Sequence, residues 1–209
     1  VGGLNLTGGF DASEVRKGKL SDEFEVAFRF FIDMINDDIA GNITVRGVDD
    51  SDFNNRSLTQ LEADILHTKA DIVMIDPFYY MTYEKNESMT SGGAAAKTSE
   101  ELRKLIGRLQ VVGFAITQAD ETAEAESDDG VRELDLPKRK DVSKTKQLMQ
   151  DASVLIAVDT DYKQGRGLVG VNKGRDGGEG DFTEIMYVPQ IGIVREFEVG
   201  ESAVSDFDF

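Results

Sequence analysis

The stretch Asp71-Ile72-Val73-Met74-Ile75-Asp76 is followed about forty residues later by Val111-Val112-Gly113-Phe114-Ala115-Ile116-Thr117-Gln118. A continuous apolar run of about four to eight residues is typical of a parallel strand that is covered on both faces. Each run ends in a polar side chain, Asp76 or Gln118, and ligands bind at the carboxyl ends of the strands in open α/β sheets. The two stretches therefore predict buried parallel strands whose polar ends form part of a binding rim.

The composition fits one globular domain. The chain has 209 residues and 40% of them are hydrophobic, which is enough for the core of a single α/β domain. No apolar run approaches the roughly 18 residues that span a membrane, and no secretory signal is visible. The absence of Cys excludes disulfides and thiolate metal sites and fits a cytoplasmic protein, and a single histidine, His67, excludes a histidine cluster. We expect a domain over residues 1–200 and an acidic tail over residues 201–209.

The hydrophobic periodicity and the capping residues predict the other elements. Helices are expected over Asp22–Ile39, Ser57–Lys69, Glu100–Leu109 and residues 144–150, with Ser21, Ser57 and Ser99 as caps. Strands are expected over Ile43–Val48, Val154–Asp159, Gly167–Asn172, Phe182–Val188 and Gly192–Phe197, the last three alternating like antiparallel strands joined by Gly-rich turns. Residues 84–98 are expected to form a flexible connection.

Charge is distributed unevenly along the chain. The net charge is −17, and a chain this acidic is not expected to bind nucleic acid over its surface as a whole. Residues 120–135 contain eight acids, and a basic cluster follows them: Lys138, Arg139, Lys140, Lys144 and Lys146. The acidic run indicates a mobile loop, and the basic cluster indicates either a pore lining or an ordinary solvated loop.

A Gly-rich hairpin is predicted around residues 172–180. Lys173 and Arg175 lie two residues apart, so on one strand they point to the same side and can clamp one anionic group. The planar fork of Arg suits phosphate oxygens. The alternative is a solvated turn that carries Lys and Arg for solubility.

Five stretches occur in an order and spacing that resemble those of DnaB-like replicative helicases of bacteria and phages: Ser13–Leu20, Ala70–Met81, Leu102–Gln118, Gln150–Ala157 and Asn172–Gly177. The resemblance covers most of residues 10–198. It implies an α/β fold with a RecA-like P-loop NTPase core, in which a mostly parallel sheet is flanked by helices and extended by antiparallel strands at the carboxyl-terminal end.

The same resemblance implies roles for individual residues. Asp76 holds Mg²⁺ through water, and Gln118 senses the γ-phosphate and couples it to DNA. Arg175 is an arginine finger with Lys173 as its companion, both acting on ATP bound by the next subunit of a hexameric ring. The basic cluster lies near single-stranded DNA, with the contacts expected from Arg139, Lys140, Lys144 and Lys146.

Two departures from the family matter. The sequence contains no G-x-x-x-x-G-K-[ST] phosphate loop, and the family's strand with the catalytic Glu is also absent. The chain starts at Val1, near the point where that strand ends in the family. We therefore expect part of a motor domain, with an amino-terminal segment that carries the phosphate loop as a partner.

Other functions fit the sequence as well. One alternative is another RecA-like ATPase, such as a recombinase or a KaiC-type regulator, and another is a catalytically silent assembly module. The last nine residues, Glu201 to Phe209, are acidic and end in Phe, which suits docking to a replisome protein or a frayed terminus.

Overall fold

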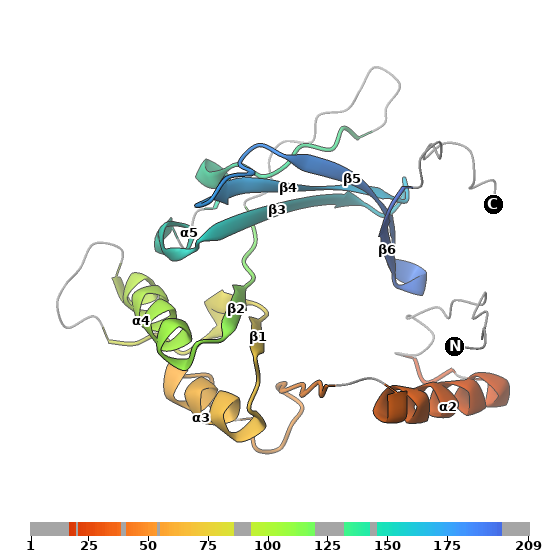
Figure 1. Ribbon diagram of the computed structural model, residues 1–209. Helices are drawn as coiled ribbons and strands as arrows, with labels where there is room; N and C mark the ends of the chain where they lie inside the picture. Colours follow the sequence, from red (N-terminus) through yellow and green to blue (C-terminus); the bar gives the residue numbers. More distant parts are fainter. Residues whose placement is uncertain are drawn as a thin grey trace. The chain divides into compact units, whose positions relative to one another are not determined.

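The computed structural model describes residues 17–19, 21–38, 41–53, 55–85, 93–119, 132–142 and 146–197. They form an α/β structure with a two-stranded parallel sheet and a four-stranded antiparallel sheet (Figure 1). The helices are α2 (Asp22–Asp38), α3 (Leu58–Thr68), α4 (Gly93–Leu109) and α5 (Lys146–Asp151), with short 3₁₀ helices η1 (Phe78–Tyr80), η2 (Arg139–Asp141) and η3 (Pro189–Ile191). The strands are β1 (Ile72–Ile75), β2 (Val112–Ala115), β3 (Val154–Asp161), β4 (Arg166–Gly174), β5 (Phe182–Val188) and β6 (Ile193–Glu196).

The chain divides into two compact units. The first contains Val1–Ile43, Asp159–Leu168 and Thr183–Phe209, and the second contains Thr44–Val158 and Val169–Phe182. All the predicted site residues that the structure describes belong to the second unit. The predicted boundaries, a domain over residues 1–200 and a tail over residues 201–209, stay a prediction, because both ends of the chain lie outside the described residues.

The core of the second unit lies between the parallel pair and two helices. β1 and β2 pair in parallel, with Ile72 opposite Val112 and Ile75 opposite Ala115, as the sequence predicts. Side chains alternate between the two faces of a strand, so Ile75 and Ala115 pack with the buried cluster, which comprises Leu58, Phe78, Leu102 and Leu105. At Gly113 a Cβ would lie 2.9 Å from Cδ1 of Ile106, so the glycine lets α4 approach the sheet closely.

The opposite face of the parallel pair corrects one expectation. The two strands were predicted to be covered on both faces, but Ile72 is 61% exposed, Met74 63% and Phe114 42%. The helices α3 and α4 cover only the face that carries Ile75 and Ala115 (Figure 1). In the part of the chain that the structure describes, the second face is therefore an open apolar surface.

The large parallel sheet that the sequence predicts is absent from the described residues. Val154–Asp159, which the sequence predicts as a strand, is part of β3, and β3 pairs with β4 in the antiparallel sheet of order β3-β4-β5-β6. A local turn explains the pairing: the Asp161 carboxylate accepts the backbone N–H groups of Lys163 at 2.8 Å and Gln164 at 3.3 Å, and Gly165 takes a positive φ of 66°. The three carboxyl-terminal strands are confirmed as antiparallel strands.

The helix predictions met different outcomes. α2 and α3 are confirmed, and Ser57 caps α3 by accepting the backbone N–H of Gln60 at 3.2 Å. The start of α4 was predicted wrongly, because the helix begins at Gly93 and takes in residues expected in a flexible connection. The strand expected over Ile43–Val48 was also wrong, since those residues are not in a strand. None of the described helices combines the length and the apolar character that crossing a membrane requires.

Candidate functional site

The predicted rim residues lie on neighbouring strands. Asp76 and Gln118 follow β1 and β2, and the backbone pairing continues past the strands, because Ile116 donates its N–H to the Ile75 carbonyl at 2.9 Å and Phe78 donates to the Ile116 carbonyl at 2.8 Å. Both side chains are exposed, and neither has a hydrogen bond or ion pair with another described residue. Their carboxylate and amide are therefore available at the carboxyl edge of the parallel pair.

An aromatic residue anchors this rim in the core. Phe78 is 0% exposed, and its ring packs near that of Tyr83 at 6.0 Å between centroids. Burial raises the pKa of the Tyr83 phenol. The chain that leaves β1 is thus fixed directly after Asp76, which gives the Asp76 backbone a defined position.

Lys173 lies at the end of β4, and its ammonium group contacts α5. It donates to the backbone carbonyls of Met149 at 2.9 Å, Gln150 at 2.9 Å and Ala152 at 2.7 Å. An ammonium group has three N–H donors, and these acceptors use all of them. In this arrangement Lys173 has no donor left for a phosphate.

Arg175 differs from Lys173 in its surroundings. Its backbone N–H donates to the Ser153 carbonyl at 3.1 Å, but its side chain is exposed and has no hydrogen bond or ion pair with a described residue. At Gly174, the residue between the two cations, a Cβ would lie 1.8 Å from the Gly177 carbonyl oxygen, so only glycine fits this turn. The two side chains predicted to clamp one anion therefore have different neighbours.

The basic segment lies against the same hairpin. Arg139 donates from Nε to the Asn172 carbonyl at 3.0 Å and from Nη2 to the Glu179 carboxylate. The Asn172 side-chain amide donates in return to the Pro137 carbonyl. The Arg139 side chain, predicted to contact DNA, is thus engaged within the protein.

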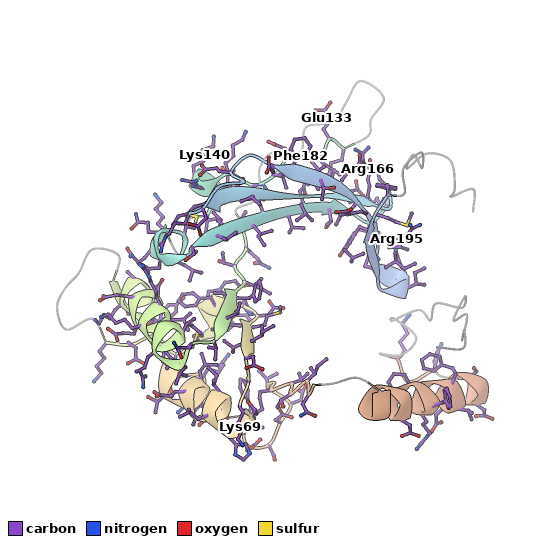
Figure 2. The ribbon with its side chains drawn as sticks, in the orientation of Figure 1. Lys69, Glu133, Lys140, Arg166, Phe182 and Arg195 are labelled. Atoms are coloured by element: carbon purple, nitrogen blue, oxygen red, sulfur yellow. The ribbon has the colours of Figure 1, made fainter. Side chains whose placement is uncertain are left out.

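The other predicted DNA-binding residues divide into two groups. Lys140 and Lys146 are exposed and have no hydrogen bond or ion pair with another described residue (Figure 2 labels Lys140). Lys144 lies outside the described residues, as does the tail that ends at Phe209. Among the described cations of the segment, Lys140 and Lys146 therefore remain available to a ligand.

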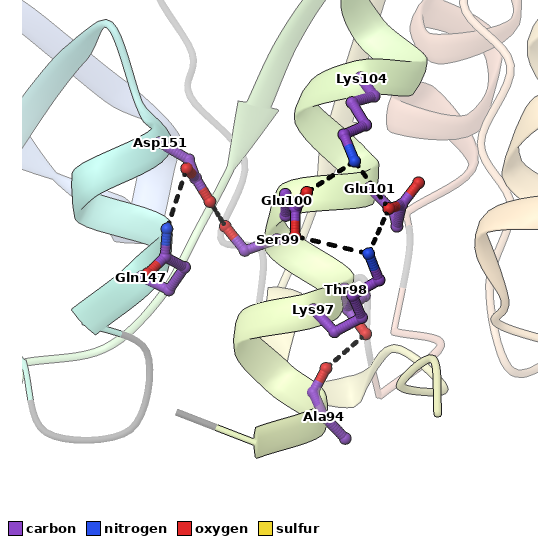
Figure 3. Close-up of polar contacts among 9 residues, drawn as sticks. All are labelled: Ala94, Lys97, Thr98, Ser99, Glu100, Glu101, Lys104, Gln147 and Asp151. Atoms are coloured by element: carbon purple, nitrogen blue, oxygen red, sulfur yellow. Dashed lines mark hydrogen bonds and ion pairs between the residues drawn. The ribbon is translucent and has the colours of Figure 1, made fainter. Parts of the chain in front are cut away.

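A polar cluster that the sequence did not indicate joins α4 to α5 (Figure 3). Ser99, 1% exposed, donates its hydroxyl to the Asp151 carboxylate at 2.6 Å, and Gln147 donates to the other oxygen of Asp151 at 3.1 Å. The sequence predicts Ser99 as the cap of a helix over Glu100–Leu109, and no spacing signal links Ser99 to a residue 52 positions away. The cluster fixes the last residue of α5.

Salt bridges cover the outer face of α4. Lys104 donates to Glu100 at 2.6 Å and Lys97 donates to Glu101 at 2.7 Å (Figure 3). These hydrogen bonds lower the pKa of both carboxyl groups and raise that of both ammonium groups. All four groups lie at the surface, so solvent screens these ion pairs and each contributes little to stability.

Neither a metal-binding group nor a similar known protein helps to identify the site. Among the described residues, no group of three or more Asp, Glu or His side chains is arranged to hold a metal ion. No protein-family model matches the sequence, and no curated protein matches it either.

Proposed function

We propose that this chain is part of the ATPase motor of a hexameric, DnaB-like replicative DNA helicase, which unwinds duplex DNA with ATP and Mg²⁺. One observation carries the proposal: Asp76 and Gln118 end adjacent parallel strands at the same edge, and both are exposed and free of partners among the described residues. In a RecA-like core, a carboxylate at this place holds Mg²⁺ through water and the neighbouring amide senses the γ-phosphate.

The hairpin supplies the second part of the proposal. Arg175 lies on a tight turn, and its guanidinium group is exposed without a partner among the described residues. A guanidinium group offers a planar fork of donors that matches phosphate oxygens. In the proposed ring it reaches the γ-phosphate of ATP bound by the next protomer.

The free lysines of the basic segment support a nucleic-acid contact. Lys140 and Lys146 lie on either side of the undescribed residues 143–145, in η2 and at the start of α5. In the proposed ring they lie near the backbone of single-stranded DNA in the central channel. The protein would act in the cytoplasm of a bacterial host or a phage-infected cell.

The sheet edges support a further strand as part of the motor. Among the described residues, β2 pairs only with β1 and β3 pairs only with β4, so each has one open edge. Apolar side chains on both strands are exposed, including Phe114 and Ile156. Open edges with apolar neighbours favour pairing with another strand. We propose that a segment carrying a phosphate loop completes the sheet at these edges.

ATP hydrolysis tests the proposal. The chain alone should hydrolyse no ATP above background, because its sequence lacks the backbone cradle and the Lys that hold the phosphates. Joined with a phosphate-loop segment, it should hydrolyse ATP in the presence of Mg²⁺, and Asp76→Ala should abolish this turnover. Turnover by the chain alone that disappears in Asp76→Ala would contradict the need for such a segment.

DNA unwinding separates the motor from the alternatives. A complete motor that hydrolyses ATP but separates no duplex would favour another RecA-like ATPase. Binding to replisome proteins without any ATPase activity in the complete assembly would favour a silent assembly module. Duplex separation that depends on Asp76 and ATP is the result that the proposal predicts.

A further inference from the structure

A lysine side chain of the same chain, Lys173, binds the carboxyl-terminal end of α5. The last carbonyl groups of a helix lack intrahelical donors and carry the negative end of the helix dipole. The Lys173 ammonium group satisfies the carbonyls of Met149, Gln150 and Ala152 at 2.7 to 2.9 Å. This contact joins the end of β4 to the α5–β3 turn and uses every donor that Lys173 has.

The same turn also fixes the backbone of Arg175. Ser153, next to the last of these carbonyls, accepts the Arg175 N–H at 3.1 Å. Residues 149–153 thus hold two residues of the hairpin. They bind Lys173 through its side chain and Arg175 through its backbone. The guanidinium group of Arg175 remains exposed beyond this attachment.

We propose that Lys173 is a positioning residue, which fixes the backbone that carries Arg175, and not a phosphate ligand. The proposal rests on the proposed function of Arg175 in trans. It assigns to Lys173 a task that the sequence did not indicate, because the carbonyls that bind it lie more than twenty positions earlier in the chain.

The position of α5 gives this contact a regulatory consequence. α5 begins at Lys146, which is proposed to lie near DNA, and ends at Asp151, which Ser99 and Gln147 hold by hydrogen bonds. Its length is only six residues. If DNA bound at Lys146 displaced α5 in the proposed motor, the carbonyls that hold Lys173 would move with it and would carry Arg175 along.

A double-mutant cycle, with kcat measured in the complete motor, tests whether Lys173 is a positioning residue. Lys173→Met removes the three donors but keeps a similar unbranched side chain. We expect it to lower kcat by about 10- to 100-fold, the scale of a small misplacement of a reacting group, without changing the KM for ATP. In the double variant with Arg175→Ala, kcat should equal that of Arg175→Ala alone, because Lys173 acts only through Arg175.

Additive losses in the double variant would overturn the proposal, since two independent phosphate contacts predict them. A rise in KM with unchanged kcat in Lys173→Met would overturn it as well. Lys163→Met is the matched control, because Lys163 is an exposed lysine of the β3–β4 turn and has no hydrogen bond or ion pair with α5 among the described residues.

Amide hydrogen exchange tests the contact independently of ATP. In the full chain without nucleotide, Lys173→Met should accelerate exchange of the Arg175 amide by about tenfold, because the Ser153 carbonyl is no longer held in place. Lys163→Met should leave this rate unchanged. An unchanged rate in Lys173→Met would contradict the positioning role even if the motor hydrolyses ATP, whereas faster exchange without any ATPase would retain the contact and reject the proposed function.

Discussion

The rim of the parallel pair and the β4–β5 hairpin carry polar residues that the same reasoning assigns to one nucleotide, yet their surroundings differ. At the rim, Asp76 and Gln118 have no partners among the described residues. At the hairpin, Lys173 binds three backbone carbonyls, whereas the Arg175 side chain has no partner among the described residues. The comparison teaches that topology decides where a polar side chain lies, whereas nearby backbone acceptors decide whether it is free to bind a ligand.

The largest expected effect concerns the free residue of the hairpin. If the proposed function holds, Arg175→Ala in the complete motor should lower kcat by about 10³-fold or more, the scale of a lost arginine finger, with little change in nucleotide affinity. Arg175→Lys should not restore the rate, because an ammonium group lacks the planar fork. Steady-state ATPase assays check both, and full rescue by Arg175→Lys would show that charge alone is needed.

The buried cluster beside the parallel pair and the open face of the pair each contain a phenylalanine, Phe78 and Phe114, which allows a matched comparison. Phe78→Ala should reduce the free energy of unfolding by about 3–5 kcal/mol, because it leaves a cavity in the core. Phe114→Ala, on the open face, should cost about 1 kcal/mol or less. Denaturant unfolding measures both changes. Equal losses would show that the face with Phe114 is covered in solution.

In the basic segment, the lysines without partners should contribute to DNA binding, whereas the engaged Arg139 should contribute to stability. Lys140→Gln and Lys146→Gln should each weaken binding to an oligothymidine strand and lower the slope of log K against log salt by about 0.7, the value for one neutralised single-strand phosphate. Arg139→Gln should leave this slope unchanged and instead lower the melting temperature, because Arg139 is engaged with Asn172 and Glu179. A salt slope reduced by Arg139→Gln alone would reverse these roles.

The smallest effect depends on pH. The Arg108 guanidinium group donates to Glu62 at 2.6 Å and lowers the pKa of the Glu62 carboxyl group below its ordinary value of 4.5. A group whose pKa is lower in the folded state stabilises that state above its ordinary pKa, and the contribution is lost as the pH falls through the lowered value. The melting temperature should therefore fall less steeply below pH 4.5 in Glu62→Gln than in the unaltered protein. Parallel curves would indicate that solvent screens the pair completely.

Local signals predicted much of the fold. The apolar runs of β1 and β2, the cap at Ser57 and the alternation of β4 and β5 all depend on neighbours a few residues away, and the structure confirms them. The predicted rim followed from these elements, because the carboxyl ends of neighbouring parallel strands share one edge.

Contacts between distant segments account for the wrong predictions. Ser99 lies inside α4, where its hydroxyl group binds Asp151, and the sequence gives no sign of that pairing. β3 joined the antiparallel sheet because the turn at Asp161 brings it beside β4, although its apolar run resembles a buried parallel strand. The carbonyl acceptors of Lys173 belong to the backbone, which has the same groups at almost every residue and so leaves no mark in the sequence.

A mixing experiment tests the central claim most directly, because it asks whether the rim and the hairpin act on one nucleotide from different protomers. Complete motors with Asp76→Ala should be inactive, and those with Arg175→Ala should keep only about a thousandth of the normal rate. Mixed rings should regain ATPase activity, since the Arg175 of an Asp76→Ala protomer can act on the site of an Arg175→Ala neighbour whose Asp76 is intact. Near-normal turnover by rings made only of Arg175→Ala protomers, or no recovery in rings shown to be mixed, would contradict the account.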